Sequence, residues 1–135
     1  MVSVCGVLYE SGEKTEITAK GSYYIKRDKR YLIYEEKSGD AAEITKNLVK
    51  FDDEVVSITK SGAVNANMVF KNGGKIITDY VTPYGNIKMG FNTKSMILTE
   101  SEEEINIQIK YALEMNGEYF TDCEIGIKIT QQGEN

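Results

Sequence analysis

Apolar and polar residues alternate with a period of two along most of this chain. In the segment INIQIKYALEM every second side chain is Ile, Tyr, Leu or Met, and those between are mostly polar. Successive side chains of a β-strand point to opposite faces of a sheet, so this pattern predicts a strand with one buried face. It places Ile107, Ile109 and Tyr111 in the core, and Gln108 and Lys110 in water.

Shorter segments with the same alternation are separated by residues that favour turns. Asn116-Gly117 is the strongest two-residue hairpin signal, because both turn positions require a positive φ. Asn72-Gly73-Gly74 predicts a second hairpin. Strands are therefore expected at residues 2–9, 15–27, 30–37, 42–51, 54–60, 66–70, 75–82, 87–92, 105–115 and 123–130.

Two further residues mark where strands bend or end. Gly21 interrupts the second strand, which predicts a bulge or a sharp bend where the missing side chain lets the sheet turn a corner. Pro83, the single proline, lies in the turn sequence TPYG.

These strands, with no apolar stripe of helical period among them, predict an all-β fold. At 135 residues the chain is expected to form a single β-barrel domain, residues 1–135. Short connections between successive strands favour an antiparallel up-and-down meander of about eight to ten strands. Such a meander either closes into a barrel or folds over as a sandwich, and closure is favoured because it removes exposed strand edges.

Strand motifs occur in a recognisable order along the chain. They are YLIYEE (residues 31–36), TKSG (59–62), MVF (68–70), YVTPYGNIKMGFNT (80–93) and IQIKYALEMNG (107–117). Their order resembles the YwiB-like family of uncharacterised bacterial proteins. The resemblance implies a lipocalin-like (calycin) barrel and no established activity. Tryptophan is absent, so the chain lacks the Gly-x-Trp signature of true lipocalins, and their ligand chemistry does not transfer.

The chain is acidic and carries no segment typical of export or membrane insertion. Its net charge of −5 gives no general attraction for nucleic acid or for an anionic membrane. Residues 1–14 lack the basic and apolar regions of a signal peptide, and no apolar run approaches the roughly 18 residues of a membrane helix. A cytoplasmic protein is therefore expected, with Cys5 and Cys123 as free reduced thiols.

The composition argues against an enzyme or a metalloprotein. Histidine is absent, which removes the commonest general base and the commonest metal ligand. Two isolated cysteines cannot supply a zinc site on their own, and neither has a basic neighbour in sequence to activate it. The adjacent Glu35 and Glu36 would point to opposite faces of a strand and cannot share one site. No catalytic residue, metal or cofactor is predicted.

The barrel interior is the favoured candidate for a binding site, with a small molecule or an anion as the ligand. An eight-stranded barrel is just wide enough to be filled by side chains or to hold one small ligand, and the sequence allows both. The residues expected to line it are Lys60, Met68, Phe70, Tyr80, Met89, Phe91 and Tyr111.

Lys60 is the charged member of this set. It shares a strand face with Ile58, and a lysine inside a barrel requires a partner or loses its proton. The expected partner is an acidic residue (Asp79 or Glu35), the hydroxyl of Tyr80, or an anionic ligand. Alternatively, the strand ends before Lys60, which would then extend into water as a turn residue.

A basic, tyrosine-rich hairpin at residues 23–34 offers a second candidate site. Basic residues interleaved with aromatic side chains can contact phosphates and stack on bases. The alternative function is therefore a contact with nucleic acid or a ribonucleoprotein through Lys26, Arg27, Lys29 and Arg30. The acidic net charge and the strand preference of tyrosine favour instead a hairpin with solvated charges.

Overall fold

The computed structural model describes residues 2–10, 12–38, 43–62, 65–82 and 84–131. Its strands are β1 (Val2–Glu10), β2 (Glu13–Lys26), β3 (Lys29–Ser38), β4 (Glu43–Phe51), β5 (Val55–Gly62), β6 (Ala66–Lys71), β7 (Lys75–Thr82), β8 (Gly85–Glu100), β9 (Glu104–Met115) and β10 (Glu118–Gln131). The predicted strand start at Ala42 and the turn residue Pro83 lie outside the described residues. None of the described segments is a helix long and apolar enough to cross a membrane.

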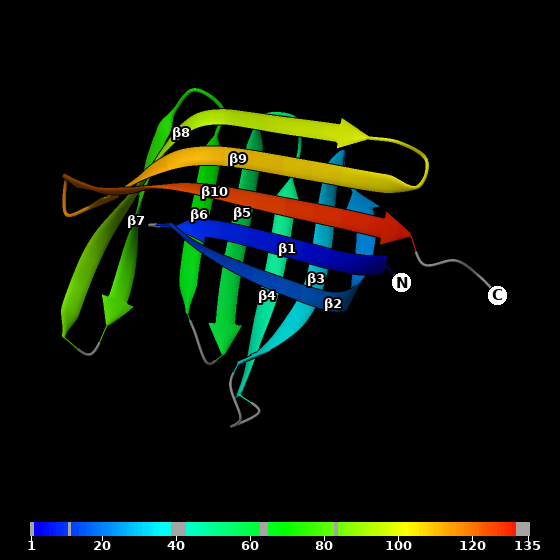
Figure 1. The fold of residues 1–135 in the computed structure, drawn as a ribbon, viewed down its shortest axis with the longest axis horizontal. Coiled ribbons are helices and arrows are strands. Elements are labelled where there is room, and N and C mark those ends of the chain that lie inside the picture. Colours follow the sequence, from blue (N-terminus) through cyan, green and yellow to red (C-terminus); the bar gives the residue numbers. More distant parts are fainter. Residues whose placement is uncertain (1, 11, 39–42, 63–64, 83, 132–135) are drawn as a thin grey trace.

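Successive strands lie side by side and antiparallel. The order in the sheet is β6-β5-β4-β3-β2-β1-β10-β9-β8-β7, so β1 and β10 are also neighbours although they come from opposite ends of the chain. Figure 1 shows β8, β9, β10 and β1 crossing in front of β3, β4, β5 and β6 at a steep angle. The strands form a nearly closed barrel, which confirms the predicted antiparallel meander.

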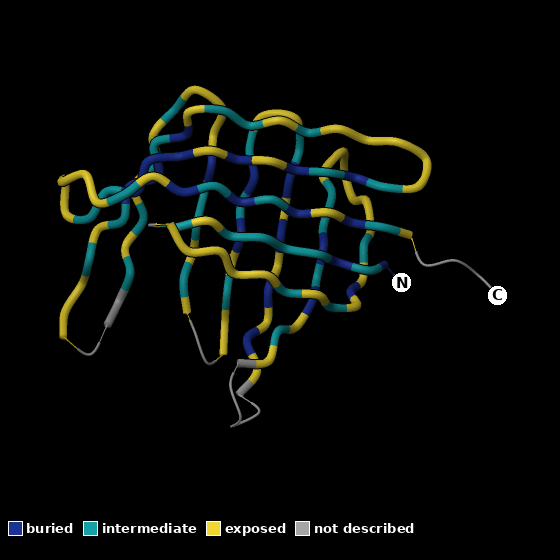
Figure 2. Tube along the Cα trace, viewed as in Figure 1, coloured by how far each residue is buried: buried dark blue, intermediate teal, exposed yellow. Residues whose placement is uncertain are grey.

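Buried and exposed residues alternate along most strands, as the sequence pattern predicts (Figure 2). In β9, Ile107 and Ile109 are fully buried and Tyr111 is 4% exposed. The intervening Gln108 and Lys110 are exposed. The two faces of β9 are therefore the ones predicted.

Two glycines occupy positions that another residue would not fit, one because of its positive φ and one because a neighbouring strand lies too close. Asn116 and Gly117, with φ of 50° and 86°, connect β9 to β10 as the predicted hairpin. Gly21 is the corner of β2, because the residues before it pair with β1 and those after it pair with β3. A Cβ atom at Gly21 would lie 2.6 Å from the carbonyl oxygen of Ile33. The predicted interruption of this strand is thus a bend between two pairing partners.

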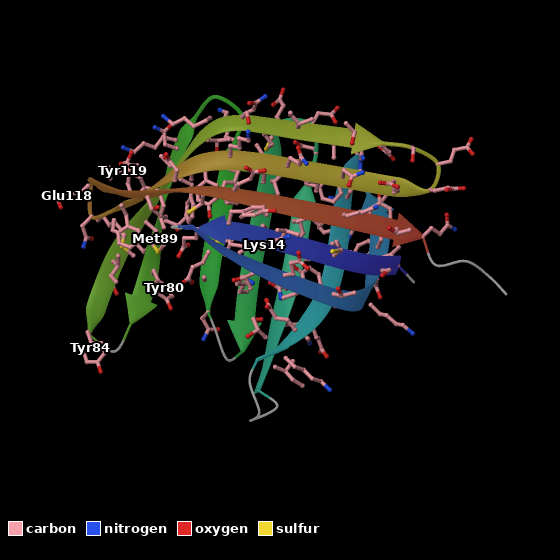
Figure 3. The ribbon with its side chains drawn as sticks, in the orientation of Figure 1. Lys14, Tyr80, Tyr84, Met89, Glu118 and Tyr119 are labelled. Atoms are coloured by element: carbon pink, nitrogen blue, oxygen red, sulfur yellow. The ribbon has the colours of Figure 1, made fainter. Side chains whose placement is uncertain are left out.

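The barrel has a seam between β6 and β7, which are the two ends of the sheet. The turn at Asn72-Gly73 connects them, but in the described residues they form no ladder with each other, so the predicted hairpin is wrong. Each strand has a partner on its other side and the two diverge, linked by a 2.9 Å hydrogen bond from the Thr78 hydroxyl to the carbonyl oxygen of Asn67. Tyr80 on β7 lies at the same end of the barrel as Met89 on β8 (Figure 3).

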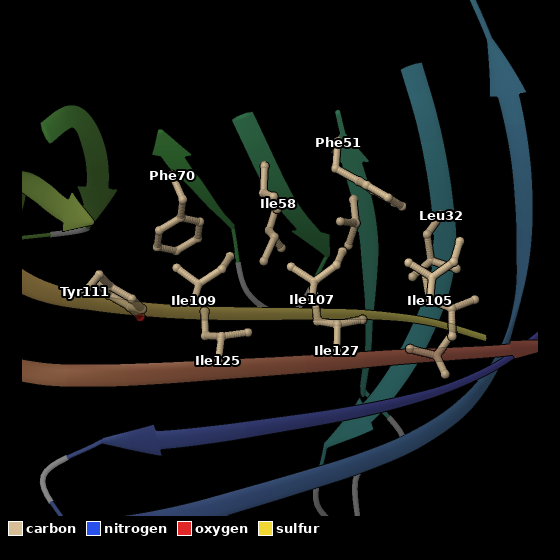
Figure 4. Packing of buried hydrophobic residues seen from close by; sticks show 14 of the residues in the cluster. Leu32, Phe51, Ile58, Phe70, Ile105, Ile107, Ile109, Tyr111, Ile125 and Ile127 are labelled. Carbon is tan, nitrogen blue, oxygen red and sulfur yellow. The ribbon is translucent and has the colours of Figure 1, made fainter. Parts of the chain in front are cut away.

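The hydrophobic core lies between the two crossing layers (Figure 4). β9 and β10 supply a row of isoleucines, which face fully buried side chains of β3, β4 and β6 such as Leu32, Phe51 and Phe70. Branched and aromatic side chains of this kind pack well on a pleated surface. The packing fixes the two layers against each other.

Candidate functional site

A cavity of about 210 Å³, partly open to solvent, is lined by side chains of the barrel interior beside the core. Its wall is built from β1, β2, β3, β5, β6, β8, β9 and β10. Apolar side chains that line it include Ile58, Met68, Met89, Phe91 and Leu113. The interior is therefore partly hollow, an outcome that the sequence had left undecided.

Aromatic rings form one part of the wall. Tyr111 and Phe91 line the cavity with ring centroids 5.8 Å apart. Phe70 packs against both, at 4.7 Å from Tyr111 and 5.3 Å from Phe91. Burial, with smaller contributions from Cys123 and Glu10, raises the pKa of the Tyr111 hydroxyl, so this residue stays neutral at physiological pH.

A polar cluster of Tyr34, Glu36, Asn47 and Lys60 interrupts the apolar wall. The Nζ of Lys60 donates to Oε1 of Glu36 at 2.7 Å and to Oδ1 of Asn47 at 2.8 Å. The Nδ2 of Asn47 donates to the same Oε1 at 2.8 Å. Asn47 is completely buried, and the side chains of Lys60 and Glu36 are 25% and 24% exposed. The three side chains form a closed triangle of hydrogen bonds.

The register of β3, β4 and β5 brings this cluster together. Asn47 lies opposite Tyr34 on one neighbouring strand and opposite Lys60 on the other, so the three residues form a row across the sheet. Glu36 is two residues beyond Tyr34 and therefore on the same face of β3. Strand pairing, and not closeness in sequence, assembles the cluster.

Glu36 is ionised at neutral pH. Burial alone would raise the pKa of its carboxyl group, but hydrogen bonds from Lys60 and Asn47, together with the charge of Lys60, outweigh burial. The pKa therefore lies below its ordinary value of 4.5. Lys60 and Glu36 form an ion pair whose charges cancel at the wall of the cavity.

The Tyr34 hydroxyl is the unsatisfied member of the cluster. Tyr34 is 6% exposed and lines the cavity, and within the described part of the chain its hydroxyl has no hydrogen-bond partner. Burial, followed by the nearby charge of Glu36, raises its pKa to about 12. It is thus a neutral group able to donate and to accept a hydrogen bond at the cavity wall.

The structure places Lys60 on the inner face of β5, as the alternation predicts, and not in a turn. The expected acidic partner is present, but the residues named for it are wrong. Glu35 and Asp79 are exposed, and Tyr80 does not line the cavity. The actual acidic partner is Glu36, because β3 turns this residue inward and its neighbour Glu35 outward.

Three residues of the cluster, Tyr34, Glu36 and Asn47, were not predicted from the sequence. Counting in steps of two from the buried Leu32 along β3 would have placed Tyr34 and Glu36 on the inner face. Asn47 precedes the buried Val49 by two residues, so both lie on the same face of β4. A polar side chain at a buried strand position indicates an internal hydrogen bond.

Of the other predicted lining residues, Met68, Met89, Phe91 and Tyr111 border the cavity. Phe70 is fully buried and packs behind the aromatic wall instead. Tyr80 is half-buried on β7 and lies outside the lining, because β7 diverges from β6 at the seam. The expectation is therefore wrong for these last two residues.

The basic hairpin is partly neutralised by carboxylates of other segments. The Nζ of Lys29 lies 3.1 Å from Oδ2 of Asp52, and Arg30 pairs with Glu100 at the far end of β8. The Arg30 guanidinium also lies 5.6 Å from the centre of the Phe51 ring. Two of the four predicted nucleic-acid contacts are thus engaged within the fold. Lys26 and Arg27 are exposed and form no ion pair within the described residues.

Both cysteines are free thiols, as predicted. They lie on the paired strands β1 and β10, but Cys5 is opposite Lys128 and Cys123 is opposite Glu10. The two sulfur atoms are therefore offset along the strands and do not face each other.

Comparison with known proteins identifies the family. A family model described as "Domain of unknown function (DUF1934)" matches residues 3–127. The chain belongs to this family. It is 33% identical over 106 residues to the uncharacterized beta-barrel protein YwiB of Bacillus subtilis (strain 168), a match that covers 78% of this chain and 73% of that protein.

A solved structure supports the same assignment. The crystal structure of the ywiB protein from Bacillus subtilis matches with a TM-score of 0.76 and 29% identity, covering 98% of this chain and 90% of that one. The resemblance to the YwiB-like family is thereby confirmed, and with it the β-barrel architecture of this DUF1934 protein.

Proposed function

We propose that this protein is a non-enzymatic, cytoplasmic binding protein that holds a small molecule in the cavity of its barrel. The observation that supports the proposal most directly is Tyr34, which lines the cavity and whose hydroxyl forms no hydrogen bond within the described residues. Unlike the Tyr23 hydroxyl and Thr93 Oγ1, which are sealed in the protein without a partner, this hydroxyl opens onto the cavity, where a water molecule or a ligand can bond to it.

The remainder of the wall suits a ligand with a polar head and an apolar body. The Lys60–Glu36 pair sits beside Tyr34, and the rest of the lining is largely aliphatic, aromatic or thioether. Small-molecule sites typically combine a mostly apolar surface with a few convergent polar groups. A barrel with no binding role gains more stability from filling such space with side chains.

A cavity-blocking substitution tests the proposal. Met68→Trp places an indole in the cavity from β6, and Val69→Trp places the same ring on the opposite face of the same strand as a matched control. Native mass spectrometry of the purified proteins should show a small bound molecule on the wild type and on Val69→Trp, and none on Met68→Trp. The proposal fails if the wild type carries no such molecule after incubation with a small-molecule cell extract, or if Met68→Trp retains it.

A further inference from the structure

The polar cluster has hydrogen-bonding capacity that the protein does not use. Both donors that reach Glu36 bond to its Oε1, and no donor of the described residues reaches its Oε2. The ammonium group of Lys60 has three N–H bonds, of which Glu36 and Asn47 take two. The Tyr34 hydroxyl lies beside them and is unsatisfied. The cluster therefore offers an acceptor and donors to a group placed in the cavity.

The charges that line the cavity disfavour a charged ligand. Lys60 is already neutralised by Glu36, so an anion gains no free cation and approaches two carboxylates, those of Glu36 and Glu10. A cation at the same place meets the Lys60 ammonium. Either ion loses water on entry, which is expensive, and the Lys60–Glu36 pair offers it no net countercharge. Glu10 also borders a second cavity lined by the exposed Lys94 and Lys110, and it accepts a 3.8 Å hydrogen bond from the Cys123 thiol.

The volume limits the size of the apolar body. A dry cavity of about 150 Å³ accommodates benzene, and this one measures about 210 Å³. Drug-sized ligands need about 300 Å³ or more. Met68, Met89 and Phe91 line the space, and thioethers pack favourably against aromatic rings.

On the premise of the proposed function, we infer that the ligand is a small neutral molecule, about the size of a substituted benzene ring. Its head group both donates and accepts a hydrogen bond, as a hydroxyl does. The head donates to Oε2 of Glu36 and accepts from the Tyr34 hydroxyl or from Lys60, and the apolar body lies against the methionines and Phe91. This assignment replaces the anionic ligand that the sequence allowed.

Four probes of nearly equal size test the assignment: toluene, benzyl alcohol, benzoate and benzylammonium. Each is titrated at about pH 7 into the ¹⁵N-labelled protein, and the amide shifts of the cavity residues on β5, β6 and β8 give the dissociation constants. Benzyl alcohol should bind about tenfold more tightly than either ion, because it alone satisfies the cluster without burying an unpaired charge. It should also bind several-fold more tightly than toluene.

Tyr34→Phe is the matching variant, with Tyr31→Phe on the same strand as control, since Tyr31 stacks on Tyr24 at a centroid distance of 5.0 Å on the outer face. Tyr34→Phe should lower the affinity for benzyl alcohol several-fold and leave that for toluene unchanged, and Tyr31→Phe should change neither. Tighter binding of a charged probe, or unchanged discrimination in Tyr34→Phe, overturns this inference while the proposed function stands. If none of the four probes shifts the cavity resonances, this inference is overturned, and the proposed function falls as well if native mass spectrometry also finds no bound molecule on the wild type.

Discussion

The ammonium of Lys60 lies 2.7 Å from a carboxylate oxygen of Glu36, although 24 positions separate the two residues in the chain. They are not on adjacent strands, because β4 runs between β3 and β5, and the completely buried Asn47 of β4 bridges them. The pair thus ties three strands together at the wall of the cavity.

Replacing Lys60 by methionine should destabilise the fold by about 2 kcal/mol, because it leaves the Glu36 carboxylate partly buried without its cation. The partial exposure of both side chains keeps the loss below that of a fully buried pair. Urea unfolding measures it. Lys46→Met is the control: Lys46 is exposed, and its loss should change the free energy of unfolding by less than about 0.5 kcal/mol. Equal effects of the two substitutions would show that the ion pair contributes nothing.

The effect of Lys60→Met should depend on pH. In the wild type the pKa of Glu36 is below 4.5, so its ionisation favours folding above that pH, and this contribution is lost as the pH falls through the lowered pKa. In Lys60→Met, burial remains without the cation, which raises the pKa of Glu36 and makes its ionisation oppose folding at neutral pH.

The difference in free energy of unfolding between wild type and Lys60→Met should therefore be largest at about pH 7. It should become smaller as the pH falls from about 5 to about 3. Urea unfolding across this range measures the difference, with Lys46→Met again as the reference. A difference that stays constant with pH would mean that Glu36 is not the partner that Lys60 stabilises.

Gly21→Ala should destabilise the protein by about 1–3 kcal/mol, because the added methyl group would lie 2.6 Å from the backbone carbonyl oxygen of Ile33. Gly126→Ala is the matched control on β10, where a Cβ atom would meet nothing within 4 Å. Thermal unfolding of the two variants gives the comparison. If Gly21→Ala is as stable as Gly126→Ala, the corner of β2 does not need the close approach of β3.

The two cysteines should differ in reactivity in the native state. Burial raises the pKa of the Cys123 thiol, an effect that the Tyr111 hydroxyl opposes and Glu10 reinforces. Because the thiolate is the reactive form, Cys123 should react with a disulfide reagent much more slowly than the less buried Cys5. In denaturant two thiols should be counted, and Cys5→Ser should remove the fast phase. A count of zero in freshly purified protein, or a fast phase that survives in Cys5→Ser, would contradict this.

Alternation within each strand determined which residues are inside, since side-chain direction depends only on the backbone of that strand. It placed Ile107, Ile109 and Lys60 correctly on the inner face. Asn116-Gly117 predicted its hairpin because the positive φ angles that this turn requires depend only on the two residues themselves. The Asn72-Gly73-Gly74 segment signalled a turn equally well. The sequence could not show that β6 and β7 would separate there, because that depends on how each strand pairs on its other side.

The binding site depended on the tertiary structure for the same reason. Glu36, Asn47 and Lys60 meet only through the register of three strands, and register is a relation between segments that no single segment encodes. The sequence therefore indicated that Lys60 needed a partner, and the fold decided which residue it was. Whether the interior is filled or hollow was also decided by the fold, because it depends on how the two layers pack and not on the size of any one side chain.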